Sequence, residues 1–279
     1  MFERSALEIA INALILGVLI LAALQFLASR SFRARGLSLG ARLRVSPATV
    51  DASAALPPLV RDFALKSGAV AGAGLKTASY TQSGTFRLDK GGPMVPVSAW
   101  EVVALGSPGF LWEGRLDAGA LRQVRTIDGL VDGKGHFEAR LLGSVPLARV
   151  SGGDMTLGQT YRYLAELPWT PDAILGNPAL AWRMVGPRSA EVSLAAGAGR
   201  AAVRFDFDAA GDIVGMSATG RPARDRKGGT TRMDWRGTFS DYAQIGPRRL
   251  PSQGEVGYVH PDGYEAYFIA RIADYRLTE

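Results

Sequence analysis

An unbroken apolar segment near the N-terminus constrains this chain more than any other feature. Residues 6–28 read ALEIAINALILGVLILAALQFLA, in which only Glu8, Asn12 and Gln25 are strongly polar. About 20 apolar residues are needed to cross the hydrocarbon core of a bilayer. Residues 13–24 also lack the polar face that a helix buried in a soluble protein would normally show. The sequence therefore predicts one transmembrane helix over residues 6–28, preceded by a short tail of residues 1–5.

A cleaved signal peptide is the alternative interpretation of this segment. Signal peptides combine a positively charged start, an apolar core of about 7–15 residues and small residues at the cleavage site. The first residues here are nearly neutral, the apolar core is longer, and Phe26-Leu27-Ala28-Ser29 is a poor cleavage site. We therefore expect an uncleaved, single-pass anchor.

The net charge of +6 is concentrated beside this anchor. Residues 1–50 carry a net charge of +4 and residues 51–279 a net charge of +2. Anionic lipid headgroups attract such an excess, and residues 29–46 are predicted to form a basic tether. No basic stripe in the remaining residues indicates nucleic-acid binding. The arginines after the anchor favour a cytoplasmic domain, but large domains are exported despite such charges, so the side of the membrane stays open.

The remaining residues, 47–279, predict one β-rich globular domain. Apolar residues recur at helical spacing in residues 47–66 and 156–175, whereas the other segments have a period of two and are separated by short turns. Connections this short require antiparallel neighbours. The expected strands are 77–88, 95–105, 110–116, 121–127, 136–142, 145–150, 180–185, 190–194, 201–207, 213–219, 231–239, 255–259 and 264–275. The predicted fold class is α+β and mainly antiparallel β, a curved sheet or half-barrel with a few packing helices, preceded by one transmembrane helix.

The expected strand at residues 95–105 is apolar on both of its faces. Val97 and Val103 point to one face, and Trp100 and Val102 point to the other. A sheet with one wet face would alternate apolar with polar residues. Either helices cover the sheet on both sides, or its concave side holds an apolar ligand.

No motif for catalysis, a metal ion or a cofactor stands out. The chain has no cysteine, and its two histidines, His136 and His260, lack the spacing of metal ligands. There is no Gly-x-Ser-x-Gly and no phosphate-binding loop. We therefore predict no catalytic residue, no metal site and no cofactor. An enzyme would need Glu166 to converge with His136 or Glu113 as acid and base.

Several segments resemble an uncharacterised bacterial family of the DUF6544/DUF6920 type. They are LPPLV at 56–60, PGFLW at 108–112, residues 124–135, YRYLAELPW at 161–169, FDFD at 205–208, residues 235–242 and Tyr264. The resemblance covers about residues 56–275 and implies no activity and no site residues. More loosely, the strand pattern with its helical insert is similar to the lipoprotein-carrier (LolA-like) half-barrels, in which a curved sheet wraps helices around an apolar cavity.

These features together predict a protein of a bacterial cytoplasmic (inner) membrane that binds a lipid or another apolar ligand. The candidate ligand-binding residues are Trp100, Phe110, Trp112, Tyr161, Tyr163 and Trp169. The expected partners are the lipid bilayer and this ligand, and not a nucleic acid. One alternative is a structural or protein-partner-binding envelope domain with a filled core. The other is a hydrolase-like enzyme acting on a membrane-derived substrate.

Overall fold

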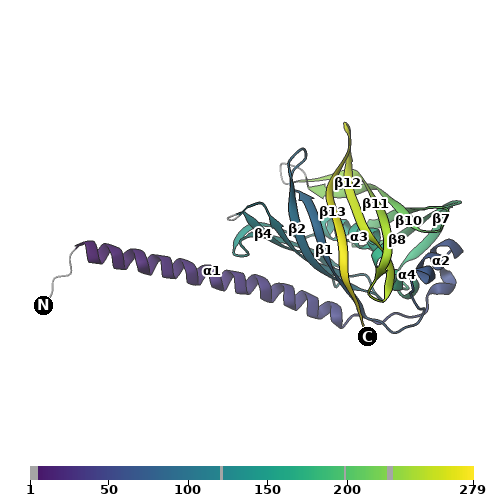
Figure 1. The fold of residues 1–279 in the computed structure, drawn as a ribbon, viewed down its shortest axis with the longest axis horizontal. Helices are drawn as coiled ribbons and strands as arrows, with labels where there is room; N and C mark the ends of the chain where they lie inside the picture. Colours follow the sequence, from purple (N-terminus) through teal and green to yellow (C-terminus); the bar gives the residue numbers. More distant parts are fainter. Residues whose placement is uncertain (1–5, 120–121, 198, 225–228) are drawn as a thin grey trace.

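Within the described residues, 6–119, 122–197, 199–224 and 229–279, thirteen antiparallel strands form one curved sheet in the computed structural model (Figure 1). The strands are β1 (Thr77–Arg87), β2 (Met94–Ala104), β3 (Phe110–Asp117), β4 (Gln123–Val131), β5 (Lys134–Leu141), β6 (Val145–Val150), β7 (Ala181–Gly186), β8 (Ser189–Ala196), β9 (Gly199–Phe207), β10 (Ile213–Arg224), β11 (Thr230–Ile245), β12 (Arg248–His260) and β13 (Gly263–Thr278). The helices are α1 (Ala6–Arg44), α2 (Pro58–Lys66), α3 (Gly153–Ala165) and α4 (Pro171–Gly176), with short 3₁₀ turns η1 (Ser53–Ala55) and η2 (Leu167–Trp169). The predicted fold class is confirmed. The predicted tail, residues 1–5, and the start of the strand predicted at residue 121 lie outside the described residues.

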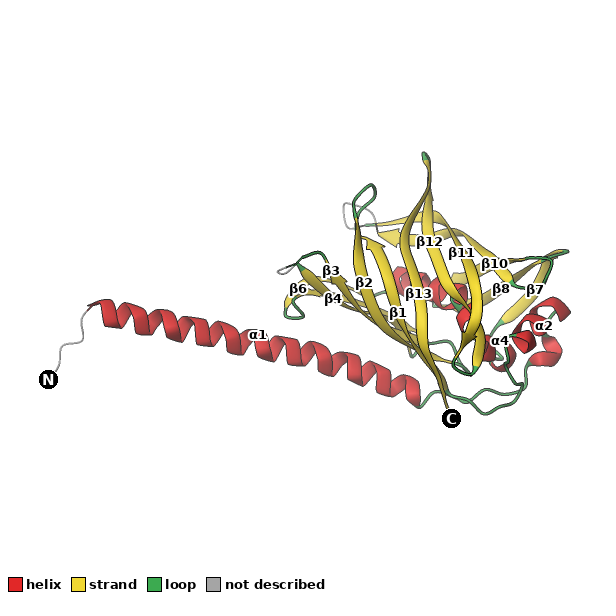
Figure 2. Ribbon diagram, in the orientation of Figure 1, coloured by secondary structure: helices red, strands yellow, loops and turns green. Residues whose placement is uncertain are grey.

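The strand order brings the first and last strands of the domain together at the centre of the sheet. The sheet runs β6-β5-β4-β3-β2-β1-β13-β12-β11-β10-β9-β8-β7, and its two runs of neighbouring strands meet where β1 pairs with β13. β6 and β7 therefore lie at opposite edges. The segment that joins them carries α3, η2 and α4 and must cross the sheet. Figure 1 shows α3 behind the central strands, and Figure 2 shows α4 beside α2 at the lower end of the sheet.

Helix α3 packs on the concave face of the sheet. It contacts β4 and β5 on one side and β8, β9 and β10 on the other. The Gly135 amide of β5 donates a 2.9 Å hydrogen bond to the hydroxyl of Thr156. A Cβ at Gly135 would lie 2.6 Å from the backbone of α3, so only glycine allows β5 and the helix to approach this closely.

Helix α1 has an exposed N-terminal part and a C-terminal part that packs on the convex face of the sheet. Phe32, Leu39 and Leu43 are buried there against apolar side chains of β2, β3 and β4. Arg35 forms a 3.1 Å ion pair with Glu138 of β5. The residues expected to form a tether therefore continue the helix to Arg44 and contact the sheet.

The strand that is apolar on both faces, β2, is buried on both faces over its second half. Val97 and Val103 belong to the large core on the concave side, which also contains side chains of α2, α3, η2 and α4. Val102 belongs to the smaller core beneath α1, and Trp100 packs against that core. Helices therefore cover the buried part of this strand, and the convex cover is α1 and not the helix predicted at residues 47–66. Val95 and Ala99 on the concave face stay partly exposed.

The hairpin of β11 and β12 is longer than the one predicted from the alternation of apolar and polar residues. The expected strands ended at residue 239 and resumed at residue 255, whereas β11 runs to Ile245 and β12 begins at Arg248. Asp241 has a φ of 57°, the left-handed conformation, within β11. This residue interrupts the alternation of the side chains, so the strand continues where its sequence pattern stops.

Candidate functional site

The concave face of the central strands carries apolar side chains that are partly exposed. α3 contacts β4, β5, β8, β9 and β10, and η2 contacts β12. Single side chains reach the central strands, since Trp169 packs against Tyr80 of β1 and Arg162 pairs with Glu101 of β2. Apolar side chains on these central strands are partly exposed around the core on this side. We call them the inner apolar wall, and they are Phe86, Val95, Ala99, Val256, Tyr258 and Tyr267.

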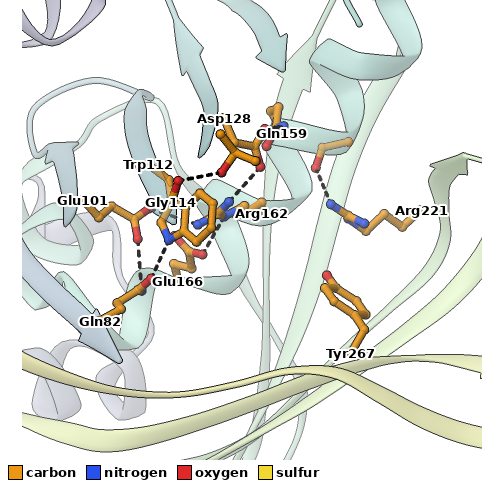
Figure 3. A network of polar contacts seen from close by, with 12 residues as sticks. Gln82, Glu101, Trp112, Gly114, Asp128, Gln159, Arg162, Glu166, Arg221 and Tyr267 are labelled. Atoms are coloured by element: carbon orange, nitrogen blue, oxygen red, sulfur yellow. Dashed lines mark hydrogen bonds and ion pairs between the residues drawn. The ribbon is translucent and has the colours of Figure 1, made fainter. Parts of the chain in front are cut away.

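A buried polar network lies beside this wall and is centred on Arg162 of α3 (Figure 3). Its guanidinium forms ion pairs with three carboxylates, at 2.7 Å to Glu166, 2.8 Å to Asp128 and 3.5 Å to Glu101. Glu166 is four residues further along the same helix, whereas Asp128 and Glu101 come from β4 and β2. The network therefore ties α3 to the sheet.

Aromatic rings and an amide complete the network. The guanidinium of Arg162 lies over the rings of Phe110 and Trp112, at 4.9 and 5.2 Å from their centroids. The Trp112 indole N–H donates to the Gln82 Oε1 at 2.6 Å, and the Gln82 Nε2 donates to Glu101 at 3.1 Å. These bonds fix the amide of Gln82 in one orientation, because its oxygen accepts from Trp112 and its nitrogen donates to Glu101.

Three carboxylates around one guanidinium leave an excess of negative charge in a buried place. Burial raises the pKa of Glu101 well above its usual range, and the charge of Glu166 raises it further. Burial also raises the pKa of Asp128, against the opposing effect of Arg162. Burial alone would lower the pKa of Arg162, but the three carboxylates outweigh it and raise that pKa. The arrangement favours a protonated Glu101 beside an ionised Arg162.

The space behind the inner apolar wall is small. A cavity of about 30 Å³ adjoins Glu166, whose Oε2 is buried without a hydrogen-bond partner among the described residues. This volume suits about one water molecule. The cavity is lined mainly by apolar and aromatic side chains, including Trp169, Met216, Trp235, Phe239 and Phe268. A ligand larger than a water molecule would lie on the wall and not in this cavity.

The six predicted ligand-binding residues are divided between the two faces of the sheet. The concave core contains Phe110, Trp112, Tyr161, Tyr163 and Trp169. Trp100 lies on the convex face beside α1 and is separated from them by the sheet.

The polar atoms of the predicted residues on α3 and η2 are already bonded within the protein. The Tyr163 hydroxyl accepts from Asn177 at 2.8 Å, and the Trp169 indole donates to the Pro251 carbonyl at 2.9 Å. Tyr161 donates to the Thr219 carbonyl at 3.3 Å. Their role in ligand binding stays a prediction. Sequence reasoning missed Glu101, although a single charge within an otherwise apolar strand was a usable signal.

The three candidate acid–base residues do not converge. Glu166 lies on the concave side, in the Arg162 network. Glu113 lies against Gly36 of α1 on the convex side. His136 shares the face of Glu138 beneath α1, where burial and then the charges of Arg35 and Arg42 lower its pKa. The described residues contain no group of three His, Asp or Glu side chains that would hold a metal ion.

Comparison with known proteins identifies the family. The model of a family of unknown function, DUF6544, matches residues 46–270. The chain belongs to the DUF6544 family. The matched residues include the inner apolar wall and the Arg162 network of this DUF6544 protein, and the resemblance recognised in its sequence is confirmed. No curated protein matches the sequence.

Solved structures are similar to this DUF6544 chain at low sequence identity. A putative outer membrane lipoprotein-sorting protein domain from Vibrio parahaemolyticus has a TM-score of 0.42 at 12% identity, over 78% of this chain and 90% of that one. A LolA superfamily protein from Nitrosomonas europaea has a TM-score of 0.41 at 5% identity, over 79% and 94%. A DUF1329 family protein from Desulfovibrio piger has a TM-score of 0.39 at 10% identity, over 78% and 90%. One of these structures belongs to the LolA superfamily, to which the strand pattern was compared above. At these TM-scores and identities, no function follows from the similarity.

Proposed function

We propose that this DUF6544 protein is anchored in a bacterial cytoplasmic membrane and binds a lipid or another apolar ligand on the concave face of its sheet. The inner apolar wall carries this proposal. Ligand sites are concave and largely apolar, with a few polar groups that fix orientation. The wall has these properties, because its six side chains are partly exposed and border the Arg162 network.

The exposed surface of α1 supports the membrane anchor. The helix from Glu8 contains an apolar stretch long enough to cross a bilayer, and the domain buries none of that stretch. Leu14 and Leu21, for example, are 69% and 67% exposed. A continuous apolar helix surface of this size would be unfavourable in water and is suited to lipid.

The contacts between α1 and the sheet support a domain held close to the membrane surface. Arg140 of β5 donates a 3.0 Å hydrogen bond to the carbonyl of Ala28, the last residue of the predicted span. Its guanidinium also lies 5.1 Å from the centroid of the Phe32 ring. The domain is therefore joined to the anchor by packing as well as by the chain, which brings the inner apolar wall near a source of lipid.

A second candidate, a protein-partner-binding domain, is favoured by the small cavity. The cavity behind the wall holds about one water, which is too little space for an acyl chain. A partner that covers the wall from outside would need no such space. The hydrolase-like alternative required Glu166 to meet His136 or Glu113. Glu166 lies on the concave face and the other two lie on the convex face, so this pairing has no support.

Native mass spectrometry of the full chain in a nonionic amphipol, followed by solvent extraction, tests the proposal. We expect a lipid retained in a stoichiometric amount after extensive exchange of the annular lipids. Ala99→Phe would fill the concave side at the wall, and the matched control Ser98→Phe changes the adjacent residue on the convex face. We expect Ala99→Phe to lose the lipid and Ser98→Phe to keep it, with unchanged thermal unfolding of the control. An apo mass for the wild type, or equal retention by both variants, would favour the partner-binding candidate.

A further inference from the structure

Arg221 of β10 is paired differently from two other arginines with buried carboxylate partners. Arg162 has three carboxylate partners, and Arg248 pairs with both oxygens of Asp172 at 2.7 and 2.8 Å. Among the residues that the structure describes, Arg221 has no carboxylate within ion-pair distance. A cation removed from water is unfavourable unless an anion or several hydrogen bonds compensate it.

The neighbours of Arg221 are aromatic or neutral. Its guanidinium carbon lies 4.4 Å from the centroid of the Trp235 ring and 5.7 Å from that of Tyr258. The guanidinium donates one hydrogen bond to the Tyr258 hydroxyl and a long one, 3.4 Å, to the Gly158 carbonyl of α3. Its Nε is buried and has no acceptor among the described residues. Within the described chain, the Nε–H of Arg221 is therefore a buried donor that is still free to bind an anion.

The position of Arg221 is at the margin of the inner apolar wall. Trp235, Tyr258 and Tyr267 lie on the three strands that follow β10 across the sheet, and Tyr258 and Tyr267 belong to the wall. Figure 3 shows Arg221 beside Tyr267 and apart from the Arg162 cluster. Asp128, a carboxylate whose charge acts on Arg221, pairs with Arg162 at 2.8 Å.

We propose that Arg221 binds the anionic head of an amphiphile whose apolar chain lies on the inner apolar wall. The head is a phosphate or a carboxylate, because a guanidinium offers two parallel donors to such groups. The aromatic rings hold the guanidinium flat and keep water from it, which strengthens its attraction for an anion. This inference rests on the proposed function and adds the charge of the ligand to it.

Binding of short amphiphiles to the full chain in a nonionic amphipol tests the inference. The probes are octyl phosphate, octanol, octyltrimethylammonium and inorganic phosphate, titrated by isothermal calorimetry. We expect the wild type to prefer octyl phosphate to octanol and to octyltrimethylammonium, with an affinity that falls as salt is added.

Arg221→Gln should weaken the binding of octyl phosphate about tenfold or more, because a hydrogen-bonded charge pair is lost, and leave the binding of octanol unchanged. The control is Arg232→Gln, which removes an exposed arginine paired with Asp154 and should change neither.

The outcomes separate this inference from the proposed function. Equal affinities for octanol and octyl phosphate in the wild type would overturn the role of Arg221 and leave apolar binding in place. No binding of either probe would remove the proposed function as well. Inorganic phosphate that binds as tightly as octyl phosphate would make the site one for a free anion and overturn the amphiphile. The probe preference and salt dependence of the wild type decide the matter even if Arg221→Gln does not fold.

Discussion

At the scale of single residues, Glu101 is a carboxylate of the polar network whose ionised form is strongly disfavoured by burial. Its side chain is fully buried, and its Oε1 has no hydrogen-bond partner among the described residues. Burial and the neighbouring Glu166 raise its pKa well above 4.5. In the unfolded chain the same carboxyl would titrate near its usual value. The folded protein therefore holds a proton at pH values where the unfolded chain has lost it.

This difference predicts a pH-dependent effect of Glu101→Gln. Stability contributed by the protonated Glu101 is present below pH 4.5 and is lost as the pH rises through the folded pKa. Glutamine imitates the protonated form and does not titrate. We expect Glu101→Gln to become more stable relative to the wild type as the pH rises, by up to about 1.4 kcal/mol per pH unit. Urea unfolding of the full chain in amphipol from pH 4 to 8 would measure it.

A surface variant provides the control for that titration. Glu191→Gln removes a strand carboxylate whose partner, Arg183, is largely exposed, and its stability should follow that of the wild type at every pH. A constant difference between Glu101→Gln and the wild type would mean that Glu101 has the same pKa in both states. The opposite slope would mean that Glu101 is ionised in the folded protein.

The sequence indicated the aromatic residues of the concave core more readily than its charges. Phe110, Trp112 and Trp169 follow from hydrophobic patterning, and all three are buried on the concave side. Arg162 and Glu166 have the spacing of an ordinary surface pair on a helix. That spacing could not reveal that the helix lies inside the curve of the sheet, where Glu101 and Asp128 from distant strands surround the pair.

At the scale of elements, α1 has two halves in different surroundings. The part up to Ala28 presents its apolar side chains outward, whereas Leu39 is buried against the convex face and Leu37, two residues earlier, is 74% exposed. Gly36 allows the close approach, since a Cβ there would meet Glu113. A helix expected to be only an anchor and a tether is thus also a packing element of the domain.

Substitutions at two leucines of α1 test how strongly this helix packs on the sheet. Leu39→Ala removes a buried side chain and should lower the free energy of unfolding by about 2–4 kcal/mol, and trypsin should cleave faster at the arginines of α1. Leu37→Ala removes an exposed side chain and should change both by little. Urea unfolding and timed proteolysis in amphipol would measure these effects. Equal behaviour of the two variants would mean that α1 does not rest on the sheet in solution.

The strands themselves follow from the sequence, because short turns and a period of two are local signals. Their order does not. β1 pairs with β13 across nearly the whole domain, with Thr77 opposite Thr278. Nothing in the residues of one strand identifies a partner so far along the chain. The position of the helical insert follows only once β6 and β7 are known to be opposite edges.

At the scale of the whole molecule, the contacts of α1 predict how the domain sits on the membrane. Arg140 of β5 reaches the carbonyl of Ala28. The neighbouring edge strand β6 exposes Val145 and Leu147, each more than half accessible. Apolar side chains at an exposed sheet edge favour contact with another surface. If residues 6–28 span the bilayer, this edge lies at the lipid interface.

The absence of cysteine from the sequence allows a direct measurement of this arrangement. A nitroxide label at Leu147→Cys should be accessible to oxygen and protected from a water-soluble nickel chelate, because oxygen concentrates in lipid and the chelate does not. A label at Ala209→Cys, in the exposed turn after β9 on the far half of the sheet, should show the reverse. Labels that are both open to the chelate would mean that the sheet edge stands clear of the bilayer. In that case the bond between Arg140 and Ala28 would lie in water, and the membrane-spanning part of α1 would have to end before residue 28.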